Sequence, residues 1–221
     1  DQVAAQPTES WLITDDPTVA EQDAAYQFDQ RIILPASPFE ESVDVEQTHL
    51  ARLFATVLEV LEQATPPFLI WVHAQAMLGP WDAPYHLRAQ FAMEDDPPPN
   101  HFATPVDRWL ADDFDPDELL GIQHAYAGQV AVLDLCLGLL LDAFWSRPVA
   151  GETALIATSP RGYPMGEHRC VGHREFPLYG ELLHVPLLLH LPSGEAATVR
   201  VQDPVQPADC HATLLQWLKI P

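Results

Sequence analysis

The run Pro66-Pro67-Phe68-Leu69-Ile70-Trp71-Val72-His73 decides the fold class of this 221-residue chain. The two prolines end a helix, and the apolar residues after them are typical of a buried strand. Upstream, apolar residues between positions 45 and 63 recur at the 3,4 spacing of one helix face, namely Leu50, Leu53, Phe54, Val57, Leu58 and Leu61. A helix that passes through a short break into a buried strand is the repeating unit of an α/β protein.

The same alternation extends along the rest of the chain. Further apolar strands are expected at residues 11–14, 31–34, 154–158 and 185–190, and a closing helix at 207–218. Residues 95–116 are rich in Asp and Pro, which predicts an exposed connection without a core of its own. The pattern predicts one α/β domain over residues 1–221, with a mostly parallel sheet and helices on both of its faces.

The longest helix is expected to begin at Asp115 and to continue to about Phe144. Asp115 is a carboxylate at the N-cap, Pro116 stands at the first helical position, and Glu118 is placed to reach back to the free amides. An apolar stripe that we expect to point inward consists of Leu119, Ile122, Tyr126, Val130, Leu133, Leu137, Leu140 and Leu141.

Composition disfavours several classes of function. The formal net charge of -22 disfavours binding to nucleic acids and to anionic membrane surfaces. No apolar run reaches the roughly 18 residues that a bilayer span needs, and the first residues lack the features of a secretory signal. The three cysteines (Cys136, Cys170, Cys210) are too few for a disulfide framework, which favours a reducing compartment, and so the cytoplasm, slightly.

Positive charge gathers in the loop after the strand at 154–158. Arg161, His168, Arg169, His173 and Arg174 form this cationic loop, and Glu167 is the one acidic residue between Arg161 and Arg174. Open α/β sheets bind ligands at the carboxyl ends of their strands, so the loop is a candidate site for sulfate, phosphate or carboxylate. The alternative is a set of surface charges that pair with the acidic excess.

The histidines offer further candidates. His73 ends a strand and could act as a base or as a hydrogen-bonded residue at the edge of the core, and His184 is equally open. The candidates for catalysis are therefore His73, His168 and His173. The spacing of His168, Cys170 and His173 matches no common closed zinc site and lacks a fourth ligand, so no metal ligand is predicted. The Walker loop, the Gly-x-Ser-x-Gly elbow and the His-Glu-x-x-His helix are absent.

Five groups of residues, in this order, resemble the sulfatase family of the alkaline-phosphatase superfamily. They are residues 67–73 with Gly79-Pro80-Trp81, residues 126–141, residues 154–158 with Gly166-Glu167-His168, residues 179–181 with His184-Val185-Pro186 and Pro192, and residues 205–209 with Thr213-Leu214-Leu215. The resemblance implies an alkaline-phosphatase/sulfatase-like fold and the hydrolysis of sulfuric esters. It also implies a sulfated or other anionic small molecule as partner.

The chain departs from the family at the residues that carry the chemistry. In an active sulfatase, an Asp and a His or Asn at the end of this strand bind a divalent cation, which is calcium. At these two positions this chain has Pro160 and Arg161. The histidine that contacts the sulfate ester falls on Leu78, and the lysine after Gly172 is His173. None of the three cysteines lies in the Cys/Ser-x-Pro-x-Arg context of the nucleophile. No cofactor is therefore expected in this chain.

Asp15-Asp16 follows an apolar strand, as the metal-binding aspartate pair near the family's amino terminus does. However, residues 24–29 and the strand after them resemble a later segment of the family. We therefore expect a single sulfatase-like domain that lacks the family's N-terminal portion and is inactive as it stands. Two alternatives remain: part of an active sulfatase or phosphoric ester hydrolase completed by upstream sequence, or an anion-binding interaction module with Arg161, Arg169 and Arg174 as its ligands.

Overall fold

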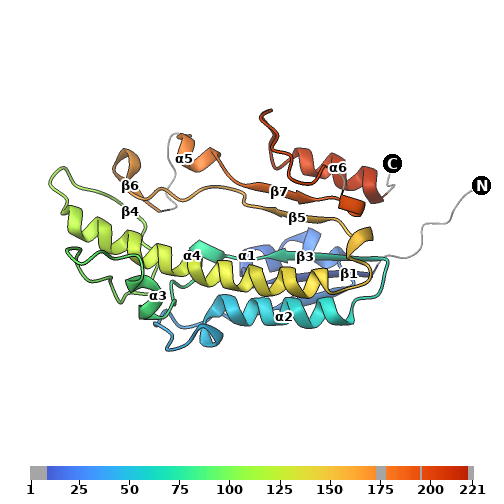
Figure 1. The fold of residues 1–221 in the computed structure, drawn as a ribbon, viewed down its shortest axis with the longest axis horizontal. Helices are drawn as coiled ribbons and strands as arrows, with labels where there is room; N and C mark the ends of the chain where they lie inside the picture. The colour runs from blue at the N-terminus through green and yellow to red at the C-terminus, as the bar shows by residue number, and fades with distance from the viewer. Residues whose placement is uncertain (1–8, 173–177, 195, 219–221) are drawn as a thin grey trace, which may run out of the picture.

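A computed structural model of the chain describes residues 9–172, 178–194 and 196–218. Helices and strands alternate along most of it (Figure 1). The strands are β1 (Glu9–Thr14), β2 (Gln30–Ile33), β3 (Phe68–His73), β4 (Arg108–Trp109), β5 (Leu155–Thr158), β6 (Cys170–Val171) and β7 (Leu187–His190). The α-helices are α1 (Pro17–Ala20), α2 (His49–Gln63), α3 (Tyr85–Ala89), α4 (Pro116–Trp145), α5 (Gly180–Leu183) and α6 (Asp209–Leu218). The α/β class is confirmed.

The first three long strands form a parallel sheet in the order β2-β1-β3. Ile13 of β1 lies opposite Ile32 of β2 and Val72 of β3. Because β1 has a hydrogen-bonded neighbour on each edge, its residues from Trp11 to Thr14 are all buried. This part of the predicted parallel sheet is confirmed.

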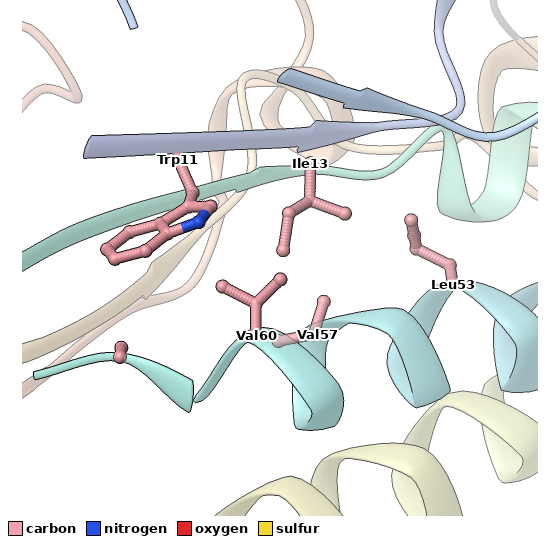
Figure 2. Packing of buried hydrophobic residues seen from close by; sticks show 6 residues of the cluster. Trp11, Ile13, Leu53, Val57 and Val60 are labelled. Carbon is pink, nitrogen blue, oxygen red and sulfur yellow. The ribbon is translucent and has the colours of Figure 1, made fainter. Parts of the chain in front are cut away.

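Helix α2 covers one face of this sheet. Trp11 and Ile13 point from β1 toward Leu53, Val57 and Val60 on α2 (Figure 2). The 3,4 spacing that predicted the helix therefore identifies the face that packs on the strands. Complete burial of an aliphatic side chain stabilises a fold by about 1.5–3 kcal/mol, so this cluster fixes α2 against the sheet.

Helix α4 is the central helix of the molecule, and its most buried face differs from the predicted one. Gly121, Ala125, Gly128, Val132 and Cys136 form the buried row. These side chains are small, so α2 and α3 pack closely on this row. The predicted stripe is only partly covered, and Val130 is 40% exposed.

The start of α4 follows its sequence signals in part. The Asp115 side chain accepts a hydrogen bond from the backbone N of Asp117 at 3.0 Å, as an N-cap should. The predicted reach of Glu118 back to the cap is wrong, because its carboxylate pairs with Arg108 at 2.5 Å instead. Glu118 therefore binds Arg108 of β4 instead of the backbone amides at the start of its own helix.

By length and apolar composition, α4 could also cross a membrane, and it is one such helix among the described residues. The sequence argument that excluded any such segment was too strict, because it required an unbroken apolar run. In this fold α4 packs against α2 and α3, as the core helix of a globular domain does.

The later strands pair differently from the prediction. β5 and β7 form an antiparallel two-stranded sheet, and β4 and β6 form another. β7 pairs with β5 without a long helix between them, so the short α5 turn allows the chain to return in the opposite direction. Within the described residues the strands therefore make three small sheets.

The segment 95–116 has a core, contrary to the prediction. Ala103 and Leu110 are buried, and Phe102 and Phe114 pack in the same cluster as Trp81. The Arg88 guanidinium binds the carbonyls of Asn100 and Phe102 at 2.7 and 2.8 Å. Contacts with α3 and α4 thus order a segment whose Asp and Pro content suggested a solvated loop.

Candidate functional site

A buried polar network lies where β1 ends, at the carboxyl edge of the parallel sheet. Its centre is Asp15, whose Oδ2 lies 2.9 Å from Nε2 of His49. The Oδ1 atom of Asp15 accepts a hydrogen bond from the backbone N of Gln75 at 2.8 Å. Both carboxylate oxygens are therefore engaged. The network joins the ends of β1 and β3 to the start of α2.

The other ring nitrogen of His49 extends the network to Ser37. His49 Nδ1 lies 3.0 Å from Ser37 Oγ, and an Arg52 Nη donates to the same oxygen at 2.5 Å. The order Ser37, His49, Asp15 has the connectivity of a hydrolytic triad. Ser37 is buried, however, and its oxygen already accepts from a guanidinium. The arrangement holds the loop before α2 in place rather than presenting a nucleophile.

Asp82 and Gln129 extend the network from the backbone of His49 to helix α4. Asp82 Oδ2 accepts a hydrogen bond from the backbone N of His49 at 2.6 Å, which satisfies one of the free amides at the start of α2. Gln129 on α4 donates to Asp82 Oδ1 at 3.3 Å and accepts from the backbone N of Ala83 at 2.9 Å. These residues connect the sheet edge to the central helix.

Of the two catalytic candidates that lie in the described ranges, His73 and His168, the structure places His73 at this edge. Its Nε2 lies 3.6 Å from Oδ2 of Asp16, and both side chains are partly exposed. Asp16 is also the N-cap of α1, since its Oδ1 accepts from the backbone N of Thr18 at 2.8 Å. A partly exposed histidine and carboxylate could together bind or exchange a proton at the surface.

Two residues of the cationic loop, His168 and Arg169, pair with acidic side chains. His168 stacks on Tyr179, with ring centroids 3.6 Å apart, and its Nδ1 lies 2.6 Å from Oε1 of Glu181. Hydrogen bonding by a backbone amide and by His168 holds the pKa of Glu181 below its ordinary value. Arg169 forms an ion pair with Asp112. His173 and Arg174 lie outside the described residues, and His184 is exposed.

The end of β5 is held tightly against α5. The backbone N of Gly162 donates to the carbonyl of Leu182 at 2.9 Å, and a Cβ at Gly162 would lie only 1.8 Å from the carbonyl oxygen of Glu181. Glycine is therefore required at this close approach. Ser159 Oγ donates to the carbonyl of Arg161 at 2.7 Å. These contacts fix Arg161, which is partly buried, at the carboxyl end of the strand.

The described residues do not fit the calcium ion of active sulfatases. Calcium takes six to eight oxygen ligands. No group of three His, Cys, Asp or Glu side chains within the described ranges could hold a metal ion. Asp15 already binds His49 and Gln75, and Pro160 and Arg161 bring no carboxylate to the end of β5.

The two tryptophans beside the Gly79-Pro80 turn differ in burial. Trp81 is fully buried and donates its indole N–H to the carbonyl of Met77 at 2.9 Å, so it is a core residue. Trp71, by contrast, is exposed on β3. The three cysteines are free thiols.

Sequence reasoning missed His49, Ser37, Asp82 and Gln129. These residues are 12 to 47 positions from their partners, so no local spacing relates them. The one available signal was Thr48, a good N-cap residue that marks where α2 begins beside the sheet edge.

Comparisons with known proteins agree with this geometry. The family model described as Sulfatase matches residues 6–220. The chain belongs to the sulfatase family. The match confirms the assignment made from the order of the sequence motifs. No curated protein matches this sulfatase-family domain.

Solved structures share the fold of the sulfatase-family domain at low sequence identity. A phosphonate monoester hydrolase of Agrobacterium radiobacter has a TM-score of 0.69 at 17% identity over 96% of this chain. BT4656, in complex with its substrate D-glucosamine-2-N,6-O-disulfate, has a TM-score of 0.72 at 15% identity over 97% of this chain. The domain spans 56% of the first protein and 59% of the second.

Proposed function

We propose that residues 1–221 form a sulfatase-like domain that does not hydrolyse sulfate esters by itself. The observation that carries this proposal is the carboxyl end of β5, where Pro160 and Arg161 occupy the positions at which the family resemblance expects two metal ligands. The turn is fixed by the close contact of Gly162 with α5, so these residues are part of the folded edge. A guanidinium there repels a cation.

The hydrogen bonds of Asp15 and Asp16, the two carboxylates after β1, support the same proposal. Both oxygens of Asp15 have partners inside the protein, and Asp16 caps α1. A metal ion would have to share these carboxylates with the partners that they already bind. The domain thus combines the family fold with a sheet edge that favours anions over cations.

Turnover measurements test this proposal directly. The purified chain is incubated with 4-nitrophenyl sulfate and with a 4-nitrophenyl phosphonate monoester, with added calcium and with a chelator. We expect release of 4-nitrophenol at the rate of the buffer blank in each case. Release that co-elutes with the chain on gel filtration and is abolished by the chelator would overturn the proposal and favour an active ester hydrolase.

A second candidate function is the binding of a sulfated or other anionic small molecule at the cationic loop. A neighbour of the same fold has a disulfated sugar as its substrate. In this chain Arg161, His168 and Arg169 occur together in the loop after β5. An anion would compete with Asp112 for Arg169 and with Glu181 for His168, so binding should be weak and sensitive to salt.

Calorimetric titration with sulfate and with a sulfated glucosamine tests this second function. The heat of binding should be lost in Arg161→Ala and Arg169→Ala and kept in Arg200→Ala, an exposed arginine outside the loop. The absence of heat with the unmodified chain would exclude the anion-binding function. Equal heats in all four proteins would exclude the cationic loop as its site.

A further inference from the structure

Acidic residues outnumber basic residues by more than three to one in this domain. The chain has 32 Asp and Glu residues against ten Lys and Arg, which gives its formal net charge of -22. A net charge far from zero destabilises a compact state, because like charges repel one another when the chain folds. The partners of the basic residues and of the carboxylates decide how much of this repulsion the fold compensates.

Three arginines donate their hydrogen bonds to uncharged groups. Their partners are backbone carbonyls and a serine hydroxyl, and they are Arg52, Arg88 and Arg147. Two carboxylates near Arg88, those of Glu41 and Asp82, favour its charged form. The hydrogen bonds of these guanidinium groups hold carbonyls and a buried hydroxyl in place, and they do not neutralise exposed carboxylates.

Five carboxylates have a histidine as their partner. The distance from the histidine nitrogen to the carboxylate oxygen is between 2.6 and 3.6 Å in these pairs. The acidic members are Asp15, Asp16, Glu41, Asp96 and Glu181. A neutral imidazole does not cancel the charge of a carboxylate, and an ordinary histidine is mostly neutral above about pH 7.5. In alkaline solution these contacts therefore leave the net charge of the domain close to its formal value.

Helix α2 carries acidic residues near its C-terminus, where the helix dipole is negative. Glu62 lies in the last turn, Glu59 precedes it by three positions on the same face, and both are exposed. The last turns of α2 and α4, both within the described ranges, contain no basic residue. Arg147 offsets part of this charge, because it binds the carbonyls of Leu61 and Ala64. The remaining charge at this end of α2 opposes folding.

The size of the domain decides how far such repulsion extends. A folded chain of this length has a radius of gyration of about 17 Å. The Debye length is about 30 Å at 10 mM ionic strength and about 3 Å at 1 M. At the lower ionic strength the carboxylates therefore repel one another across the whole domain, whereas at the higher one each acts on its immediate neighbours alone.

We propose that this domain depends on dissolved monovalent cations for its stability, and that they act by screening its acidic surface and not by occupying one site. The folded state is stable at high ionic strength and is lost progressively as the salt is diluted in alkaline solution. The acidic excess thus makes the fold sensitive to the ionic strength of its surroundings. This inference does not rest on the proposed lack of hydrolysis, and either can fail without the other.

Urea denaturation at pH 8, followed by circular dichroism, tests the dependence on salt. The chain is unfolded at KCl concentrations from about 10 mM to about 1 M, the range over which the Debye length falls tenfold. We expect the urea midpoint to rise by at least about 1 M across this series. Choline chloride should give the same rise, since screening depends on ionic strength and not on the identity of the cation. An unchanged midpoint would overturn the proposal.

Calcium distinguishes screening from a bound ion. The same denaturation is repeated with micromolar calcium chloride at constant ionic strength, and with a chelator. The midpoint should be equal in both solutions. A midpoint that rises with calcium and falls with the chelator would overturn the proposal, because it would assign the stabilisation to a specific site. A rise in KCl that choline chloride does not reproduce would overturn it in the same way.

Two substitutions of similar shape and opposite charge change test the local origin of the effect. Glu59→Gln removes a carboxylate near the end of α2, and Gln63→Glu adds one at the exposed last residue of the same helix. At 10 mM KCl the first should raise the urea midpoint and the second should lower it. Both shifts should disappear at 1 M KCl. Shifts of equal size at the two salt concentrations would show a change in packing or helix propensity, and would contradict the role of charge.

Discussion

The Nε2 atom of His49 lies 2.9 Å from the Oδ2 atom of Asp15, in a pair whose side chains are almost fully buried. One residue belongs to the first turn of α2 and the other follows β1 directly. A single contact thus joins the helix that covers the parallel sheet to the edge where sheets of this kind place their sites.

The first prediction concerns this pair. Asp15→Asn should lower the free energy of unfolding by about 1–3 kcal/mol, because its single amide oxygen can serve only one of the two partners and its NH2 group must face either His49 Nε2 or the backbone N of Gln75. Urea denaturation followed by circular dichroism measures the change. Asp23→Asn, at an exposed position, is the control and should change stability by less than about 0.5 kcal/mol. Equal stabilities of the two variants would contradict a structural role for the network.

A second prediction compares two glycines of α4. A Cβ at Gly128 would lie 2.7 Å from Cγ and 3.1 Å from the backbone N of Arg88, whereas nothing lies within 4 Å of a Cβ at Gly138. Gly138→Ala should therefore stabilise the protein by up to about 1 kcal/mol through helix propensity. Gly128→Ala should destabilise it, since α3 must move away. Thermal unfolding of both variants checks the opposite signs; stabilisation by both would show that α3 does not pack on Gly128.

The third prediction concerns Arg88, which is fully buried on α3. Its guanidinium donates to four backbone carbonyls, those of Trp81, Ala83, Asn100 and Phe102. An ammonium cannot span these acceptors, so Arg88→Lys should cost more than about 2 kcal/mol and loosen the segment 95–116. Limited proteolysis of that segment provides the readout. Arg31→Lys, at an exposed position, should leave the cleavage rate unchanged.

The fourth prediction concerns the thiols. Burial raises the pKa of Cys136 to about 11, so this thiol stays neutral at pH 8 and should not react with Ellman's reagent in the folded protein. Cys210, which is partly exposed on α6, should react first, and Cys210→Ser should remove the fast phase. Fast loss of the Cys136 thiol in that variant would contradict the burial.

The same raised pKa has a consequence for stability. The unfolded chain loses the Cys136 proton near pH 9, whereas the folded chain keeps it until about pH 11. The stabilising contribution is therefore complete below pH 9 and is lost as the pH rises through this interval. Cys136→Ala should remove this part of the alkaline dependence, measured by urea denaturation between pH 8 and pH 10.

The elements with strong periodicity were predicted well from the sequence. The strand at Phe68–His73 has the expected bounds, and α2 buries the face that its apolar spacing indicated. The pairing of β7 with β5 was predicted less well, because an apolar run reveals that a strand is buried but not which edge it joins. The burial of part of the segment 95–116 was not predicted for a similar reason. The residues that bind and pack against it, Arg88 and Trp81, lie outside the segment.

The candidate site was predicted only in its outline. The sequence located the cationic loop at the end of a strand, and the structure adds the acidic partners Asp112 and Glu181 that neutralise part of its charge. Asp112 lies 57 positions from Arg169, so no pattern near the arginine could have indicated it. The buried network around His49 was missed because it depends on contacts between distant segments.

Helix α4 contributes a residue to each of the four hydrophobic clusters found in the described residues. Leu140 packs against the cluster of Trp11 and Ile13, and Val132 belongs to the cluster of Leu50 and Phe54. Ile122 belongs to the cluster of Trp81, and Phe144 to the cluster of Leu61. The four clusters are therefore linked through one helix, and we expect the domain to unfold as one cooperative unit. A local defect at either end of α4 would then lower the global stability of the whole domain, including the distant sheet edge.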